Sequence, residues 1–202
     1  MLHACFAERR RAFSLIEVLV AAALGFVVLL LLGYLAARIL AIMSLTQRQG
    51  SLQHEAFVAW KSIDSDLRRS SKAALTVADP LLHGGDQILL LRTIDAASIQ
   101  GAPLYEPGLA VYLHRNSSSE LSRKIIAVPL VGKPSRILEA NIDAIVGSAS
   151  SNQRLLTPHL TSISFVAQDG GLQVALKLSA PAEGGSPATS FEISHFTLVK
   201  NP

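Results

Sequence analysis

The chain has 202 residues, which allows one domain and an additional element, since single domains typically hold roughly 100–200 residues. Half of the residues are hydrophobic, only 16% are charged, and much of the net charge of +3 comes from Arg9, Arg10 and Arg11. DNA-binding proteins rely on dense Lys and Arg clusters, and nothing after Arg11 is as dense, so nucleic acid is not an expected partner. A single cysteine, Cys5, excludes an intramolecular disulfide.

The N-terminal segment predicts a membrane-spanning helix over residues 13–43. Val18 to Ala37 contains no formal charge, and at 1.5 Å per residue this stretch rises about 30 Å, the thickness of a bilayer's hydrocarbon core. Only Arg38 interrupts the apolar character before Met43, and the stretch is too long for a secretory signal peptide. The arginines that precede it place the N-terminus in the cytoplasm by the positive-inside rule, so the rest of the chain is expected to be exported.

Glu17 is an unusual residue at the start of this apolar stretch. A carboxylate deep in lipid costs about 2.5–3.5 kcal/mol, so such a residue usually has a function. In the alternative interpretation, Glu17 lies close enough to the membrane interface to be hydrated. Its position in the sequence leaves both interpretations open.

Residues 44–72 predict an amphipathic continuation of the helix, ending at about Ser71. Apolar residues recur there at spacings of three, four and seven between polar residues. The apolar stripe is expected to pack on a sheet of the head, with an interface to a partner helix as the alternative. Its members are Leu45, Leu52, Ala56, Phe57, Trp60, Ile63 and Leu67.

Residues 73–202 predict a β-rich head, and therefore an α+β fold in which a long N-terminal helix packs on an antiparallel sheet. Two hairpins are expected, one joining Ser162–Ala167 to Leu172–Leu178 and one joining Leu109–Arg115 to Leu121–Val128. Residues 147–153 and 181–189 are expected to be surface loops. The predicted strands are Ile88–Thr93, Leu109–Arg115, Lys124–Val128, Leu160–Ala167, Leu172–Leu178 and Phe191–Val199.

No pattern predicts an enzyme, a metal site or a cofactor. The six histidines do not stand at metal-ligand spacing with each other or with the cysteine. Asp64 and Asp66, with Asp79 and Asp86 further on, are too loosely spaced for a calcium loop, so Asp64 and Asp66 are interpreted as a solvated helix end. Glycine loops that bind phosphate and nucleophile elbows are also missing from the sequence, so no catalytic residue is predicted.

Residues 11–21, Arg-Ala-Phe-Ser-Leu-Ile-Glu-Val-Leu-Val-Ala, resemble the cleavage and methylation motif of type IV prepilins and type II secretion pseudopilins. The resemblance implies that a prepilin peptidase removes the leader, residues 1–12, by cutting between Ala12 and Phe13, and methylates the new N-terminus of Phe13. It also implies that Glu17 pairs with the positively charged N-terminus of a neighbouring subunit during assembly. Recognition of Glu17 by the assembly platform or the peptidase is the alternative role, and the two roles are compatible. Ala12 departs from the family, which nearly always has Gly there, and its additional methyl group predicts slower cutting.

The resemblance further implies a pilin-like protein that crosses the bacterial inner membrane once, with a periplasmic head, or that stands at a filament tip or the cell surface. The implied partners are other pilins or pseudopilins along the N-terminal helix, the peptidase, the inner-membrane assembly platform and membrane lipid. The chain's size and its Trp60–Arg69 stretch are similar to the larger minor subunits of the J or W type, which prime or cap a filament. Two alternatives stay open, an adhesin or DNA-uptake pilin whose head binds a ligand, and a single-pass membrane protein that never polymerises.

Overall fold

The computed structural model describes residues 14–97, 103–127, 137–150, 152–168, 170–182 and 188–199, and it confirms the predicted α+β architecture. The chain forms two compact units, which divide between Ser44 and Leu45, and a single helix contributes to both. The elements are α1 (Leu15–Arg68), β1 (Ser70–Val77), β2 (Gln87–Ala97), β3 (Pro103–Tyr105), β4 (Leu109–His114), β5 (Leu121–Ile126), the 3₁₀ turn η1 (Glu139–Asn141), α2 (Ile142–Gly147), β6 (Asn152–Thr157), β7 (Leu160–Gln168), β8 (Gly171–Ala180) and β9 (Thr189–Leu198).

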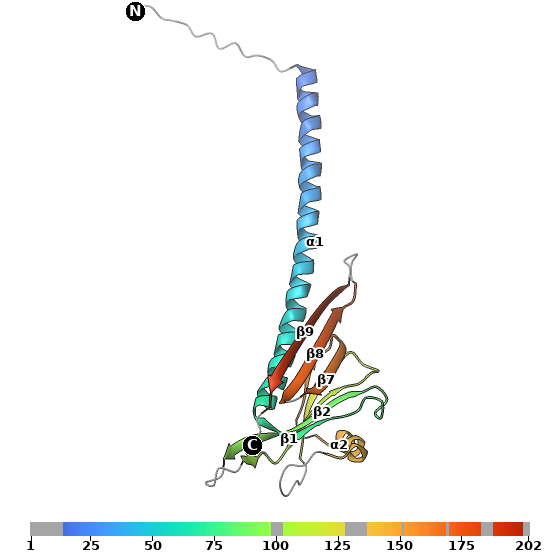
Figure 1. Cartoon of the computed structure of the whole chain (residues 1–202). Coiled ribbons are helices and arrows are strands. Elements are labelled where there is room, and N and C mark those ends of the chain that lie inside the picture. Colours follow the sequence, from blue (N-terminus) through green and yellow to red (C-terminus); the bar gives the residue numbers. More distant parts are fainter. Residues whose placement is uncertain are drawn as a thin grey trace, which may run out of the picture. The chain divides into compact units, whose positions relative to one another are not determined.

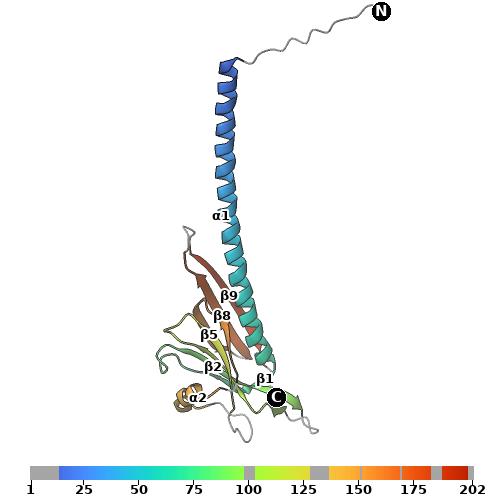
Figure 2. The same ribbon diagram turned by 180° about the vertical axis from the view of Figure 1, so that it is seen from behind.

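The larger sheet of the second unit has the order β1-β2-β4-β5-β6, with β3 added beside β2, and all its pairs are antiparallel. Its two faces are both covered, by the second part of α1 on one side and by α2 on the other (Figures 1 and 2). Strand β4 shows the consequence most clearly, because Tyr112 faces the α1 side, Val111 and Leu113 face the α2 side, and every residue of the strand is buried. Strands of this kind are apolar at consecutive positions rather than alternating.

The smaller sheet has the order β7-β8-β9 and packs beside the same part of α1 (Figure 1). Its strands alternate as a one-sided sheet should: Phe165, Val174 and Leu176 are buried against the helix, and their neighbours are more exposed. Gly171 is a packing requirement of this sheet. A Cβ atom at that position would lie 2.3 Å from the carbonyl oxygen of Thr197 on β9.

The buried stripe of α1 confirms most of the predicted amphipathic pattern, since Leu52, Ala56, Trp60, Ile63 and Leu67 all lie in the core. Phe57 was wrongly included in the stripe, because its side chain is 56% exposed. At about 100° per residue, Phe57 lies roughly 120° around the helix from Ile63, which is in the middle of the buried stripe, so its side chain points away from the core.

Asp66 corrects a second expectation, because it is buried in the core and not part of a solvated helix end. Its Oδ2 atom accepts hydrogen bonds from the Tyr112 hydroxyl at 2.7 Å and from Arg123 Nε at 2.8 Å. Burial and the neighbouring Asp66 charge raise the pKa of Tyr112 well above its ordinary value, so the phenol keeps its proton and acts as a donor. This cluster joins α1 to β4 and β5, and it satisfies a charge that would otherwise be costly to bury.

Two further carboxylates fix the helix to the head. Asp64 accepts a hydrogen bond from Thr197 Oγ1 of β9 at 2.8 Å. Partial burial raises the pKa of Asp64, but the hydrogen bonds from Arg68 and Thr197 lower it by more, so the pKa lies below its ordinary value. Glu55 accepts a hydrogen bond from Thr157 Oγ1 at 2.8 Å and lies 3.0 Å from Nδ1 of His159. Together with Asp66, these residues attach α1 to both sheets through polar groups in addition to the apolar stripe.

Several boundaries differ from the predicted ones. Helix α1 ends at Arg68, because the chain turns at Arg69 and pairs with β2 from Ser70 onward, where the sequence predicted helix to about Ser71. The predicted loop at 147–153 is partly wrong, since Asn152 and Gln153 pair with β5, and the predicted strand to Val128 ends at Ile126. Both hairpins are confirmed, although two sheets are present instead of one. In the predicted loop 181–189, Thr189 begins β9 and residues 183–187 lie outside the described part.

Candidate assembly segment at the start of the long helix

Ser14 and Glu17 form a reciprocal pair of hydrogen bonds at the start of α1. The backbone N–H of Ser14 donates to Glu17 Oε2 at 3.0 Å, and the backbone N–H of Glu17 donates to Ser14 Oγ at 3.3 Å. This is a capping box, in which the residue before the helix and the third residue of the helix each accept a hydrogen bond from the backbone N–H of the other. The N–H of Glu17 also donates to the carbonyl oxygen of Ser14 at 3.0 Å. The carboxylate of Glu17 therefore points back along the chain, towards Ser14.

Ser14 is the residue that the sequence prediction missed, although a signal for it was present. Ser-x-x-Glu directly before an apolar run is the usual pattern of a capping box, and residues 14–17 read Ser-Leu-Ile-Glu. A capping side chain stabilises a helix by roughly 0.5–2 kcal/mol, and a negative charge in the first turn also interacts favourably with the helix dipole. Glu17 thus has a local structural role in addition to any role in assembly.

The remaining residues of the predicted site precede the described part of the chain. Arg9, Arg10, Arg11, Ala12 and Phe13 all lie outside it, so the leader, the cleavage position and the methylation position remain predictions. Of the predicted site residues, Glu17 alone is described.

The part of α1 that follows Glu17 is covered with apolar side chains that are largely exposed in the described part of the chain. The large apolar side chains between Leu15 and Met43 are each more than half exposed. By length and composition α1 can cross a membrane, and its most apolar window has no buried residue. Contiguous exposed apolar surface on this scale needs a covering, either lipid or other helices.

A second polar group on this segment, formed by Tyr34 and Arg38, is separated from Glu17 by about the thickness of a bilayer's hydrocarbon core. Arg38 Nε donates a hydrogen bond to the Tyr34 hydroxyl at 3.1 Å, and the guanidinium lies 5.6 Å from the centre of the Tyr34 ring. Tyr and Arg are typical residues of the membrane interface, where each keeps an apolar body and a polar end. The uncharged residues between Glu17 and Arg38 rise roughly 30 Å, which matches the hydrocarbon core.

Comparison with protein-family models gives a match to the prokaryotic N-terminal methylation motif over residues 8–33. The matched residues include the three arginines, the Ala12-Phe13 junction, Glu17 and the first half of the apolar segment. Neither the curated proteins nor the solved structures include a match to the chain.

The motif and the fold agree with each other. The motif implies processing by a prepilin peptidase and assembly with other pilins, and it points to a structural subunit and not to an enzyme. A long apolar helix of membrane-spanning length is what such a protein needs for anchorage in the inner membrane. The N-terminal methylation motif is carried by a long helix that packs on antiparallel sheets, and this combination supports a type IV pilin-like protein.

Proposed function

We propose that the chain is a minor pilin or minor pseudopilin, a subunit that initiates or caps a type IV pilus or a type II secretion pseudopilus. In this proposal the peptidase cuts between Ala12 and Phe13, the amine of Phe13 is methylated, and the helix leaves the membrane to join a filament. The main support for the proposal is the position of Glu17. Its carboxylate lies in the first turn of α1, and the uncharged stretch that follows it is long enough to span a bilayer.

The position of Glu17 supports a role in choosing the axial register between subunits. Its carboxylate binds a neutral backbone N–H within its own chain. A methylated ammonium group of a neighbouring subunit would add attraction between two full charges to the hydrogen bond, which the uncharged N–H cannot supply. Within an apolar bundle a charge without a partner is disfavoured by several kcal/mol, so a shift by one helical turn, about 5.4 Å, would be penalised.

The features outside the motif support a minor subunit. The head has a hydrophobic core of its own on both faces of the larger sheet, and the stretch from Trp60 to Arg69 contains Asp64 and Asp66, which fix the helix to the head. Ala12 in place of Gly is expected to slow cleavage, which a subunit needed in few copies would tolerate better than an abundant one.

Processing can be tested by intact-mass measurement on protein from cells that have a prepilin peptidase. The expected mass corresponds to loss of residues 1–12 and addition of one methyl group at Phe13. An Ala12→Gly variant should be processed faster, because its backbone enters the peptidase site more freely. A chain that still begins at Met1 in both forms would instead favour a membrane protein that never polymerises.

The role of Glu17 needs variants that separate pairing from helix capping. Glu17→Gln keeps a side chain that can accept the bond from Ser14 but removes the charge, whereas Ser14→Ala removes one half of the capping box and keeps the charge. We expect Glu17→Gln to reduce incorporation into filaments strongly while membrane insertion is unchanged, and Ser14→Ala to have the smaller effect. If the two variants are incorporated equally well, capping explains Glu17 and the pairing role is wrong.

A further inference from the structure

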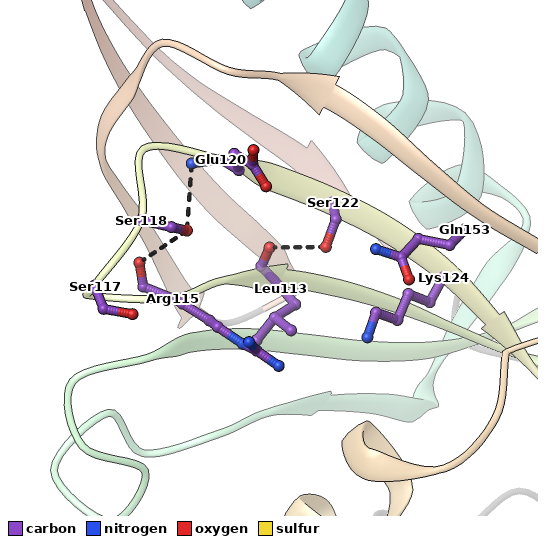
Figure 3. A pocket seen from close by; sticks show the side chains of 8 residues that line it. All are labelled: Leu113, Arg115, Ser117, Ser118, Glu120, Ser122, Lys124 and Gln153. Atoms are coloured by element: carbon purple, nitrogen blue, oxygen red, sulfur yellow. Dashed lines mark hydrogen bonds between the residues drawn. The ribbon is translucent and has the colours of Figure 1, made fainter.

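A polar pocket of about 350 Å³ lies at the end of the hairpin formed by β4 and β5 (Figure 3). The strand residues at the base of the pocket are placed by the strand register. Leu113 lies opposite Ser122, and Lys124 lies opposite Gln153 of β6, so these four side chains belong to the same face of the larger sheet. Arg115 and the turn that follows it, up to Glu120, close the other side.

Two of the described lining residues are cationic, Arg115 and Lys124. Within the described residues neither side chain forms an ion pair, and Glu120, which is the one carboxylate among the lining residues, is not bonded to either of them. Figure 3 shows the side chains of Arg115 and Lys124 extending to the same side, next to Leu113, with Glu120 apart from both cationic groups. The side of the pocket where Arg115 and Lys124 lie therefore carries an excess of positive charge.

The serine hydroxyls of the pocket are held only weakly by their present partners. Ser122 Oγ lies 3.4 Å from the carbonyl oxygen of Leu113, and Ser118 Oγ lies 3.5 Å from that of Arg115. Hydroxyl hydrogen bonds are normally 2.5–3.0 Å long, so these contacts are at the weak limit. A hydroxyl can rotate towards a better acceptor without moving the backbone.

The chemistry of this set of side chains favours an oxyanion. Guanidinium and ammonium groups donate hydrogen bonds and accept none, and the planar fork of Arg fits two oxygens of a phosphate. None of the described lining residues is aromatic, so this part of the pocket lacks the aromatic ring on which a nucleobase usually stacks. We propose that this pocket binds a phosphate group, through Arg115 and Lys124 with Ser118 and Ser122 as additional donors.

The phosphate could be free inorganic phosphate or a phosphate ester of a lipid headgroup or surface polymer. The test uses the full chain in non-ionic detergent micelles and isothermal titration calorimetry at low, constant ionic strength. Inorganic phosphate and glycerol 3-phosphate are the two probes. Saturable binding of either one supports the proposal, and the tighter of the two identifies the source. Failure of both probes to bind at millimolar concentration overturns it.

Variants separate a formed site from general charge attraction. Arg115→Gln and Lys124→Gln should each weaken phosphate binding roughly tenfold or more, because each removes charge-assisted hydrogen bonds. Arg154→Gln is the matched control. Arg154 is exposed on β6 and lies opposite Arg123, on the other face of the sheet, so its loss should change the affinity less than about twofold.

Arg115→Lys provides a second check, since it keeps the charge and removes the fork that binds two oxygens. It should weaken binding measurably, while far-UV circular dichroism shows that the fold is retained. If Arg154→Gln weakens binding as much as Arg115→Gln does, the attraction is non-specific and the site does not exist. This result is independent of leader cleavage and of Glu17, so it can fail while the proposed filament role stands.

Discussion

Removal of the Tyr112 hydroxyl tests whether the buried polar cluster stabilises the joint between α1 and the larger sheet. In Tyr112→Phe the ring stays in its place, and Asp66 loses one of its two side-chain donors, the one at 2.7 Å. A hydrogen bond to a charged group contributes about 1.5–3 kcal/mol, and a buried acceptor that is left short of partners keeps its desolvation penalty. We expect the free energy of unfolding to fall by about 1.5–3 kcal/mol.

The chain contains a built-in reporter for this measurement. Trp60 is the single tryptophan, it is buried on α1 in the same core, and its ring lies edge-on to His195 of β9 with centroids 4.7 Å apart. Urea unfolding of the full chain in detergent micelles can therefore be followed by Trp60 fluorescence. Tyr34→Phe is the matched control, because it removes a hydroxyl from the exposed apolar part of α1 and should leave the unfolding of the head unchanged.

A double-mutant cycle identifies the partner of the hydroxyl. In an Asp66→Ala background, Tyr112→Phe should cost less than in the native chain by a coupling energy of about 0.5–3 kcal/mol. A loss below about 0.5 kcal/mol for Tyr112→Phe alone, or equal losses in both backgrounds, would show that Asp66 does not depend on this bond.

Two other substitutions follow from local geometry. Gly171→Ala should destabilise the head by about 1–3 kcal/mol, because the new methyl group meets the carbonyl oxygen of Thr197. Gly147→Ala is the control, because a methyl group at that position has open space around it. Equal urea midpoints for the two variants would contradict the prediction. The pKa of His83 is raised above 6.5, chiefly by its bond to Glu139 against the effect of burial, so its stabilising contribution is complete below pH 6.5 and declines as pH rises through the raised pKa. The difference in unfolding free energy between native chain and His83→Gln should accordingly shrink from pH 6 towards pH 9, and a difference that grows would refute the assignment.

The long helix and most strands could be predicted because their patterns are local. The apolar run after Glu17 and the spacing of Leu52, Ala56 and Ile63 reflect a single helix facing first a membrane-like environment and then a core. The hairpin of β7 and β8 was equally predictable, since alternation and a glycine turn with Gly170 at φ 87° specify it within a few residues.

The features that escaped prediction depend on contacts between distant residues. Asp66 reads as a surface residue until Tyr112 and Arg123, far along the chain, are placed beside it. Strand β6 carries polar residues such as Asn152 and Gln153, and only its pairing with β5 makes it a strand. Ser14 is different, because its capping pattern with Glu17 was present in the sequence and was overlooked.

The same reasoning applies to the proposed phosphate pocket. Arg115 and Lys124 are nine positions apart in the sequence. Lys124 is placed by the register of the β4–β5 hairpin, which the sequence predicted only as a pairing and not residue by residue, and Arg115 is placed by the turn that begins after His114, the last paired residue of β4.

The burial of β4 on both sides has a consequence for how this head can vary. On β9, the outward positions Glu192 and Ser194 already carry polar side chains, so a saturation mutagenesis screen should find them permissive to almost any residue. Along Leu109–His114 no position offers such freedom, because one side is occupied by α1 and the opposite side by the cluster around Ile142. Variation among natural or engineered versions of this head should therefore accumulate in the smaller sheet and leave β4 nearly constant.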